Sequence, residues 1–188
     1  MIKAESSDKL LVINILTKSF DNNRSVNYII KQDKKRGQRL RHLMNYSFNV
    51  CNRFGNIFLS DDKKACVLVL FPDKKKFNLQ SLWFDLKLIQ GIGLANVLKA
   101  MDREALIKKL QPKELLYYLW FIGVNPADQG RGIGSTILTE VILEGTSMQR
   151  TICLEASTIK NLSWYEKFGF KIYNEIDFGY RLFLLKKE

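Results

Sequence analysis

The stretch of sequence that decides the fold runs from Tyr117 to Met148. It opens with the apolar run YYLWFIGV (117–124), passes through NPAD (125–128) to the glycine-rich QGRGIGS (129–135), and ends in a segment with helical periodicity. One face of that segment carries Ile133, Ile137, Leu138, Val141, Gly145 and Met148. The pattern predicts a strand, a glycine turn and an amphipathic helix that packs back on the strand.

The glycine turn has the composition of an anion-binding loop. Its three glycines alternate with Arg131 and Ile133, so a run of backbone N–H groups is left uncovered by Cβ atoms. The helix that follows directs its unpaired first-turn N–H groups and the positive end of its dipole at the same point. We therefore expect this turn to bind a pyrophosphate.

Size and composition indicate one folded domain, residues 1–188. A chain of 188 residues is long enough to bury a substantial core. Hydrophobic residues make up 46% and charged residues 26%, which is the balance of a globular protein rather than a disordered one. Neither an internal repeat nor a low-complexity linker marks a domain boundary.

The chain is strongly basic, with a formal charge of +11 and two dense clusters at 34–41 and 74–76. Such a charge could attract nucleic acid, an anionic membrane surface or a polyanionic cofactor. A solvated, lysine-rich surface is the simpler interpretation, because a run of charge does not specify a partner. Nucleic-acid binding is disfavoured because aromatic residues do not interleave with the first cluster.

Three cysteines, Cys51, Cys66 and Cys153, are an odd number without paired spacing, so we expect neither a metal site nor a disulfide. The N-terminal residues lack the plan of a signal peptide, and no apolar run approaches the ~20 residues that span a bilayer. These features predict a cytoplasmic protein without a membrane segment.

The remaining sequence predicts a mixed α/β chain. A short strand at 2–4 and helices at 8–20 and 34–53 precede a hairpin at 56–60 and 65–71. Helical periodicity at 77–90 and 94–110 predicts an insert that could wall a pocket, and the second helix has an apolar face of Leu94, Val97, Leu98, Met101 and Ala105. After the central helix come a strand at 151–156, a helix at about 160–168 and an antiparallel pair at 170–176 and 179–185.

This order of elements, with three motifs, resembles the GNAT superfamily of N-acetyltransferases. The family's acetyl-CoA turn has the pattern Q/R-x-x-G-x-G/A, present here as QGRGIG (129–134). IGVNP (122–126) is similar to the end of the family's fourth strand, where a bulge splays two strands apart. LEAS (154–157), Asn161 and WYEKFGF (164–170) are similar to its second motif.

The resemblance covers residues 117–172 and implies a single-domain α/β (α+β) fold. It implies a mixed, mostly antiparallel sheet flanked by helices, with a splayed strand pair at the cofactor site. The same stretch of sequence is also similar to the puromycin acetyltransferase-like branch of the superfamily, although Leu116 stands where those relatives have a histidine.

The resemblance implies that acetyl-CoA is bound by residues of two short segments, 122–124 and 129–135, and by two later residues. The set is Ile122, Gly123, Val124, Gln129, Gly130, Arg131, Gly132, Ile133, Gly134, Ser135, Asn161 and Tyr165. Asn161 could instead cap the short helix that follows it, and Arg131 could be a solvated side chain whose turn contributes only backbone groups.

An amine attacks a thioester only as the free base, so the reaction needs a proton acceptor and an acid for the leaving thiolate. The resemblance places Tyr165 as the acid; the competing role is core packing beside Trp164 and Phe168. For the base, Glu155 is our first choice and a water relay through Tyr118 the second, while Glu155 could also be purely structural.

The backbone N–H of Val124 or a neighbour is the candidate for stabilising the oxyanion. His42, the one histidine of the chain, lies far in sequence from these motifs and is not favoured as a base.

We therefore expect an acetyl-CoA-dependent N-acetyltransferase that acts on the amine of a small molecule by direct attack. Alternatives are acetylation of a protein lysine or N-terminus, and a non-catalytic acetyl-CoA-binding module. The sequence leaves the acceptor, the base and the choice between monomer and homodimer open.

Overall fold

The computed structural model describes residues 1–75 and 94–188, so the helix predicted at 77–90 lies outside the described residues. The described residues form a seven-stranded sheet in the order β1-β2-β3-β4-β5-β7-β6. Its strands are β1 (Ile2–Lys3), β2 (Gly55–Leu59), β3 (Ala65–Leu70), β4 (Leu116–Val124), β5 (Thr151–Ala156), β6 (Phe170–Asp177) and β7 (Arg181–Lys187). Among these strands β4 and β5 make the one parallel pair, so the sheet is mixed and mostly antiparallel, as predicted.

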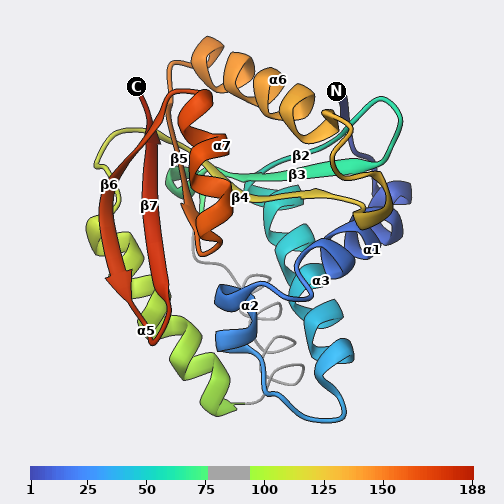
Figure 1. Ribbon diagram of the computed structural model, residues 1–188, viewed down its shortest axis with the longest axis vertical. Helices are drawn as coiled ribbons and strands as arrows, with labels where there is room; N and C mark the ends of the chain where they lie inside the picture. Colours follow the sequence, from blue (N-terminus) through green and yellow to red (C-terminus); the bar gives the residue numbers. More distant parts are fainter. Residues whose placement is uncertain (76–93) are drawn as a thin grey trace.

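Helices cover both faces of this sheet (Figure 1). They are α1 (Lys9–Ser19), α2 (Arg24–Ile29), α3 (Arg36–Phe54), α5 (Leu94–Leu110), α6 (Ile133–Ser147) and α7 (Leu162–Lys167). Short 3₁₀ turns lie at η1 (Ser6–Asp8), η2 (Pro72–Lys74), η3 (Pro126–Asp128) and η4 (Ile159–Asn161).

Alternation along the strands divides the core between the two faces. In β3, Cys66, Leu68 and Leu70 pack with α1 and α3, whereas Val67 and Val69 pack with α6. Every residue of β3 is buried, which explains why its sequence is continuously apolar rather than alternating. In Figure 1, α6 lies above strands β2 to β4 and helices α1 to α3 lie below them.

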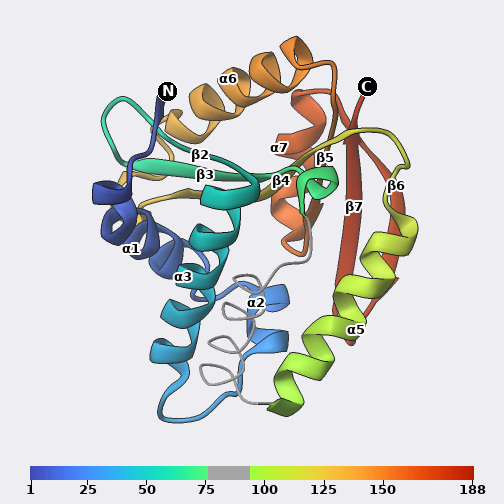
Figure 2. The same ribbon diagram turned by 180° about the vertical axis from the view of Figure 1, so that it is seen from behind.

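Helix α5 runs beside β6 and β7 in both views (Figures 1 and 2), and Ile107 packs against Ile176 and Leu182 there. Its predicted apolar face is wrong for three residues. Leu98 and Met101 are more than half exposed and Ala105 is exposed as well. The helix turns Val97, Arg103 and Ile107 inward instead, because the polar side chain of Arg103 finds partners inside the fold.

Strands β4 and β5 separate partway along their length. Their pairing covers Leu116 to Tyr118 and ends at the pair Tyr118–Cys153. On the other side of β4, Leu68 pairs with Phe121 and Val69 with Leu119, so Trp120 is an extra residue, a β-bulge. Beyond this bulge β4 continues along β3 while β5 continues along β7, which opens the predicted splay.

Helix α2 was not predicted, because six residues are too few to show helical periodicity. The segment Asp21-Asn22-Asn23 follows the first helix, which ends at Ser19, and it also starts the next. The side chain of Asn23 accepts a hydrogen bond from Val26 N–H at 3.0 Å.

The basic cluster at 34–41 is largely paired within the chain. Arg36 pairs with Asp21 at 2.6 Å, Arg39 with Asp33 at 2.8 Å, and Arg41 donates to Asn14. Lys76 of the second cluster lies outside the described residues.

The three cysteines are free and buried. Among residues 1–75 and 94–188 no helix is long and apolar enough to cross a membrane.

Candidate active site

The glycine turn connects β4 to α6 in the conformation that its sequence favours. Gly130 and Gly132 have φ angles of 79° and 81°, in the left-handed region that glycine adopts without strain. Gly132 is the N-cap residue of α6 and has no side chain to cap it, so the first-turn N–H groups are available to a ligand. No heavy atom of the described residues lies within 4 Å of a Cβ built on either glycine.

A groove of about 650 Å³, the donor groove, follows this turn. It is lined by eleven of the twelve predicted cofactor residues: Ile122, Gly123, Val124, Gln129, Gly130, Gly132, Ile133, Gly134, Ser135, Asn161 and Tyr165. Of the predicted set only Arg131 is not among the described lining residues. Its side chain is 64% exposed and lies 3.4 Å from Asp128, as the solvated alternative predicts.

The end of β4 is fixed by polar contacts. The Val124 carbonyl accepts from Ser19 Oγ at 2.8 Å and from Gln129 Nε2 at 3.2 Å. Asn125 N–H donates to Lys64 O at 2.9 Å, on the β3 side. Because N–H groups alternate along a strand, Val124 N–H and Ile122 N–H point away from β3, toward the splay. Val124 thus keeps its place as the oxyanion candidate.

Helix α7 is tied to α6 beside the groove. Trp164 Nε1 donates to Ser135 Oγ at 3.0 Å, and the Trp164 ring lies 3.7 Å from a Cβ built on Gly134. Asn161 is the N-cap residue of α7 but its side chain makes no capping hydrogen bond. The capping alternative for Asn161 is therefore wrong, and its side-chain amide has no hydrogen-bond partner among residues 1–75 and 94–188.

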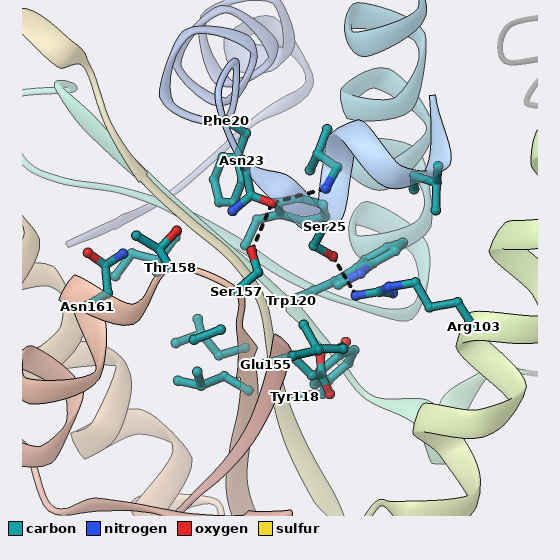
Figure 3. A pocket seen from close by; sticks show the side chains of 18 of the residues that line it. Phe20, Asn23, Ser25, Arg103, Tyr118, Trp120, Glu155, Ser157, Thr158 and Asn161 are labelled. Carbon is teal, nitrogen blue, oxygen red and sulfur yellow. Dashed lines mark hydrogen bonds between the residues drawn. The ribbon is translucent and has the colours of Figure 1, made fainter. Parts of the chain in front are cut away.

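A second cavity, the acceptor cavity, has a volume of about 130 Å³. It meets the donor groove at six residues that line both: Phe20, Asn23, Ile122, Thr158, Asn161 and Tyr165. Figure 3 shows side chains from the α1–α2 loop, α2, α5 and the two splayed strands around it. Asn23 Oδ1 also accepts from Ser157 Oγ at 3.4 Å, which holds the start of α2 against the end of β5.

Tyr165 lies where groove and cavity join. Its ring is 6% exposed and packs against Trp164 and Phe170, with centroid distances of 4.8 and 5.8 Å. Its hydroxyl has no hydrogen-bond partner among residues 1–75 and 94–188. Burial raises the pKa of Tyr165, so the phenol is protonated at neutral pH. Core packing of the Tyr165 ring and a role of its hydroxyl as an acid are therefore compatible.

Glu155 and Tyr118, the two candidates for the base, are hydrogen-bonded to each other. The Tyr118 hydroxyl donates to Glu155 Oε2, and both residues line the acceptor cavity. Burial raises the pKa of Glu155 to about 7, while the bond from Tyr118 acts in the opposite direction. A carboxyl with this pKa can gain or lose a proton near neutrality.

Sequence reasoning missed Arg103, the one charged residue among the buried polar side chains of the described residues, with 8% exposure. Its guanidinium donates to Tyr180 Oη at 3.2 Å, to Ser25 Oγ at 2.7 Å and to Glu104. A charged residue inside a helix with other lysines and arginines gives no local signal of burial. His42 is exposed on α3 and is not among the described residues that line either cavity.

Comparison with known proteins agrees with this geometry. Residues 88–172 match the family model described as acetyltransferase (GNAT) domain. A histone acetyltransferase HPA2-related acetyltransferase from Corynebacterium glutamicum superposes with a TM-score of 0.76 at 20% identity, over 99% of this chain and 94% of that one. The C-terminal condensation domain of Ebony, solved with beta-alanyl-dopamine, gives 0.71 at 13% identity, over 100% and 97%.

Arylalkylamine N-acetyltransferase 2 from Aedes aegypti gives a TM-score of 0.67 at 14% identity, over 99% and 96% of the two chains. At these identities the likeness shows a shared fold. The family model supports the predicted superfamily and acetyltransferase class over residues 88–172, and the solved structures share the predicted fold; the puromycin acetyltransferase-like branch stays a prediction.

Proposed function

We propose that this chain, which contains a GNAT acetyltransferase domain, is a single-domain enzyme that transfers acetyl from acetyl-CoA to the amine of a small molecule. The observation that carries this proposal is the meeting of donor groove and acceptor cavity at Tyr165 and Asn161. Two substrates bound on either side would bring their reacting atoms to one place, and that proximity supplies much of catalysis.

The donor groove fits coenzyme A. Its open glycine turn and the unpaired N–H groups of α6 suit a pyrophosphate, and the amide of Asn161 suits the amide-containing arm. Acetyl-CoA supplies an acetyl group already activated as a thioester. The chain has to hold it, orient it and stabilise the negative charge that its carbonyl oxygen gains, for which Val124 N–H points into the splay.

The proton acceptor in this proposal is Glu155. Ionised, it takes a proton from the incoming amine, directly or through a water, and Tyr118 holds the carboxylate in place. Tyr165 stays protonated because burial raises its pKa, so it can donate its hydroxyl proton to the departing thiolate. The acid, Tyr165, then lies on α7 and the base, Glu155, on β5, and both line the acceptor cavity.

The size of the acceptor cavity favours a small molecule. An apolar cavity of about 150 Å³ is large enough to bind benzene, so about 130 Å³ suits one ring or a short chain. Its lining also contains buried side chains of Val26 and Leu43 and the rings of Phe20 and Phe121. The amine would extend from this cavity toward Tyr165.

The test is release of free CoA thiol from acetyl-CoA in the presence of a panel of amines and lysine peptides, each measured with the wild-type chain and with Tyr165→Phe. We expect turnover with small apolar amines and none with peptides. Turnover only with peptides would favour protein acetylation. Acetyl-CoA binding by calorimetry without turnover on any amine would favour the non-catalytic binding module.

A further inference from the structure

We propose that Arg103 selects the acceptor by binding an uncharged oxygen atom at the end of the molecule opposite its reacting amine. This inference rests on the proposed function and adds the chemistry of the acceptor. It assigns the substrate class as apolar amines that carry a hydroxyl or carbonyl at their far end.

The cavity has two distinct ends. Figure 3 shows Asn161 and Thr158 at one end and Arg103 with Ser25 at the other, with Trp120 between them. The first end is shared with the donor groove, so the reacting amine has to lie there. Whatever the acceptor carries at its far end therefore meets Arg103.

The far end is rich in hydrogen-bond donors. A guanidinium has five N–H groups, and three bonds of Arg103 to described residues leave two of them without a described partner. Ser25 Oγ accepts from Arg103, so its own hydroxyl proton remains to be donated. Buried donors without an acceptor are costly, and an oxygen on the acceptor would satisfy them.

Charge decides which kind of oxygen fits. Arg103 is the only cationic side chain among the described residues that line the cavity, and its charge is already matched by Glu104. Glu155 lies close enough to both for their charges to act on it. An acceptor carboxylate would add a third anion around one cation, whereas a hydroxyl or carbonyl accepts the same hydrogen bonds without repulsion.

The wall of the acceptor cavity contains aromatic rings. The rings of Trp120 and Phe121 lie 5.4 Å apart and those of Phe20 and Phe121 lie 5.1 Å apart, the second pair edge to face. Rings of this kind pack well against an apolar or aromatic body. This wall suits an acceptor whose two polar ends are separated by one ring.

Three amines with the same ethylamine arm test the inference: tyramine with a phenol oxygen, phenethylamine with none, and the para-carboxy analogue of phenethylamine. We expect tyramine to exceed phenethylamine about tenfold in kcat/KM, because one buried donor set is left unsatisfied without the oxygen. We expect the carboxy analogue to be the poorest of the three. Calorimetric binding of each amine to the chain is measured in parallel.

The variants are Arg103→Met and Ser25→Ala, the second chosen because it removes one donor and leaves the buried guanidinium in place. We expect the preference for tyramine to vanish in Arg103→Met and to fall about threefold in Ser25→Ala. Arg150→Met is the matched control: the side chains of Arg103 and Arg150 are each 9% exposed and ion-paired, but Arg150 is not among the described lining residues. Its preference should equal that of the wild type.

The inference is overturned if phenethylamine is used as well as tyramine, if the carboxy analogue is preferred, or if the preference survives both variants. Acetylation of all three amines at equal rates contradicts the role of Arg103 and leaves the proposed function intact. Absence of turnover contradicts the proposed function instead, and the binding preference, measured without catalysis, then decides the role of Arg103.

Discussion

The donor groove and the acceptor cavity meet at Tyr165, but they are lined by different parts of the chain. Ten of the residues that line the groove come from one stretch, the end of β4, the glycine turn and the start of α6, where the glycines leave backbone N–H groups uncovered. The cavity is formed by side chains from the α1–α2 loop, α2, α5, β4 and β5. A backbone site demands particular φ angles and therefore glycines at fixed spacing, whereas a side-chain site can be assembled from any elements that converge.

This difference explains how the two sites respond to change. The backbone N–H groups of the glycine turn are lost as a binding site when the conformation of the turn is altered. A cavity made of side chains can be retuned one residue at a time without disturbing the donor. Substitutions should therefore separate donor affinity from acceptor chemistry.

The largest effect is expected from Gly132→Glu. The substitution places a side chain with a carboxylate at φ 81° in the turn, where it would both strain the backbone and occupy the position of an anionic ligand. We expect acetyl-CoA affinity to fall at least about 100-fold, as for the loss of charge-assisted hydrogen bonds. Isothermal calorimetry measures it.

Gly179→Glu is the matched control for Gly132→Glu. Gly179 has φ 79° and, like Gly132, open space around a Cβ, but it lies in the turn between β6 and β7. The control carries the same strain and the same charge. Equal affinities for acetyl-CoA in the two variants would show that the glycine turn does not bind the donor.

Glu155→Gln should lower kcat/KM about 100-fold at pH 7 while donor affinity stays unchanged, because the amide cannot accept a proton. Glu155 acts as a base only when ionised, so the pH profile of the wild type should show an inflection at its pKa of about 7, in addition to the rise that comes from deprotonation of the amine. The variant should retain only the rise that comes from deprotonation of the amine itself. Identical pH profiles in the two proteins would show that Glu155 is structural.

The contrast between groove and cavity also sets what the sequence can predict. Gly130 and Gly132 lie in one motif and Tyr165 in a second, each with a fixed pattern, and all three line one groove in the structure. The partners of Arg103 stand 78 and 77 positions away, at Ser25 and Tyr180, so only the folded chain brings them together. The hydrophobic pattern predicted the wrong buried face for α5. Such a pattern does not indicate an arginine whose burial is compensated by hydrogen bonds to distant hydroxyls.

Tyr165→Phe should slow acetyl transfer about tenfold, less than the ~100-fold at the low end for general acid catalysis, because burial raises the pKa of this phenol and makes it a weak acid. Donor affinity should stay within about twofold, since the ring keeps its packing. Tyr173→Phe is the control: its hydroxyl is buried and has no hydrogen-bond partner among the described residues, and Tyr173 is not among the described residues that line either cavity. An unchanged rate of acetyl transfer in Tyr165→Phe would show that Tyr165 is not the acid.

The smallest effect, and the sharpest separation of the two sites, is expected from Tyr118→Phe. The hydrogen bond from Tyr118 lowers the pKa of Glu155, so its loss should move the inflection of the pH profile above about 7, by about one pH unit or less. The rate should then fall several-fold on the acid side and recover at high pH, where Glu155 is ionised in both proteins.

Tyr117→Phe provides the neighbouring comparison for Tyr118→Phe, because the hydroxyl of Tyr117 bonds Glu144 on the opposite face of the sheet. It should leave the inflection where it is in the wild type. Donor affinity should be the same in all three proteins, since neither tyrosine is among the described residues that line the groove. An inflection that moves equally in both variants would mean that the shift comes from loosened packing of β4 and not from the bond to Glu155.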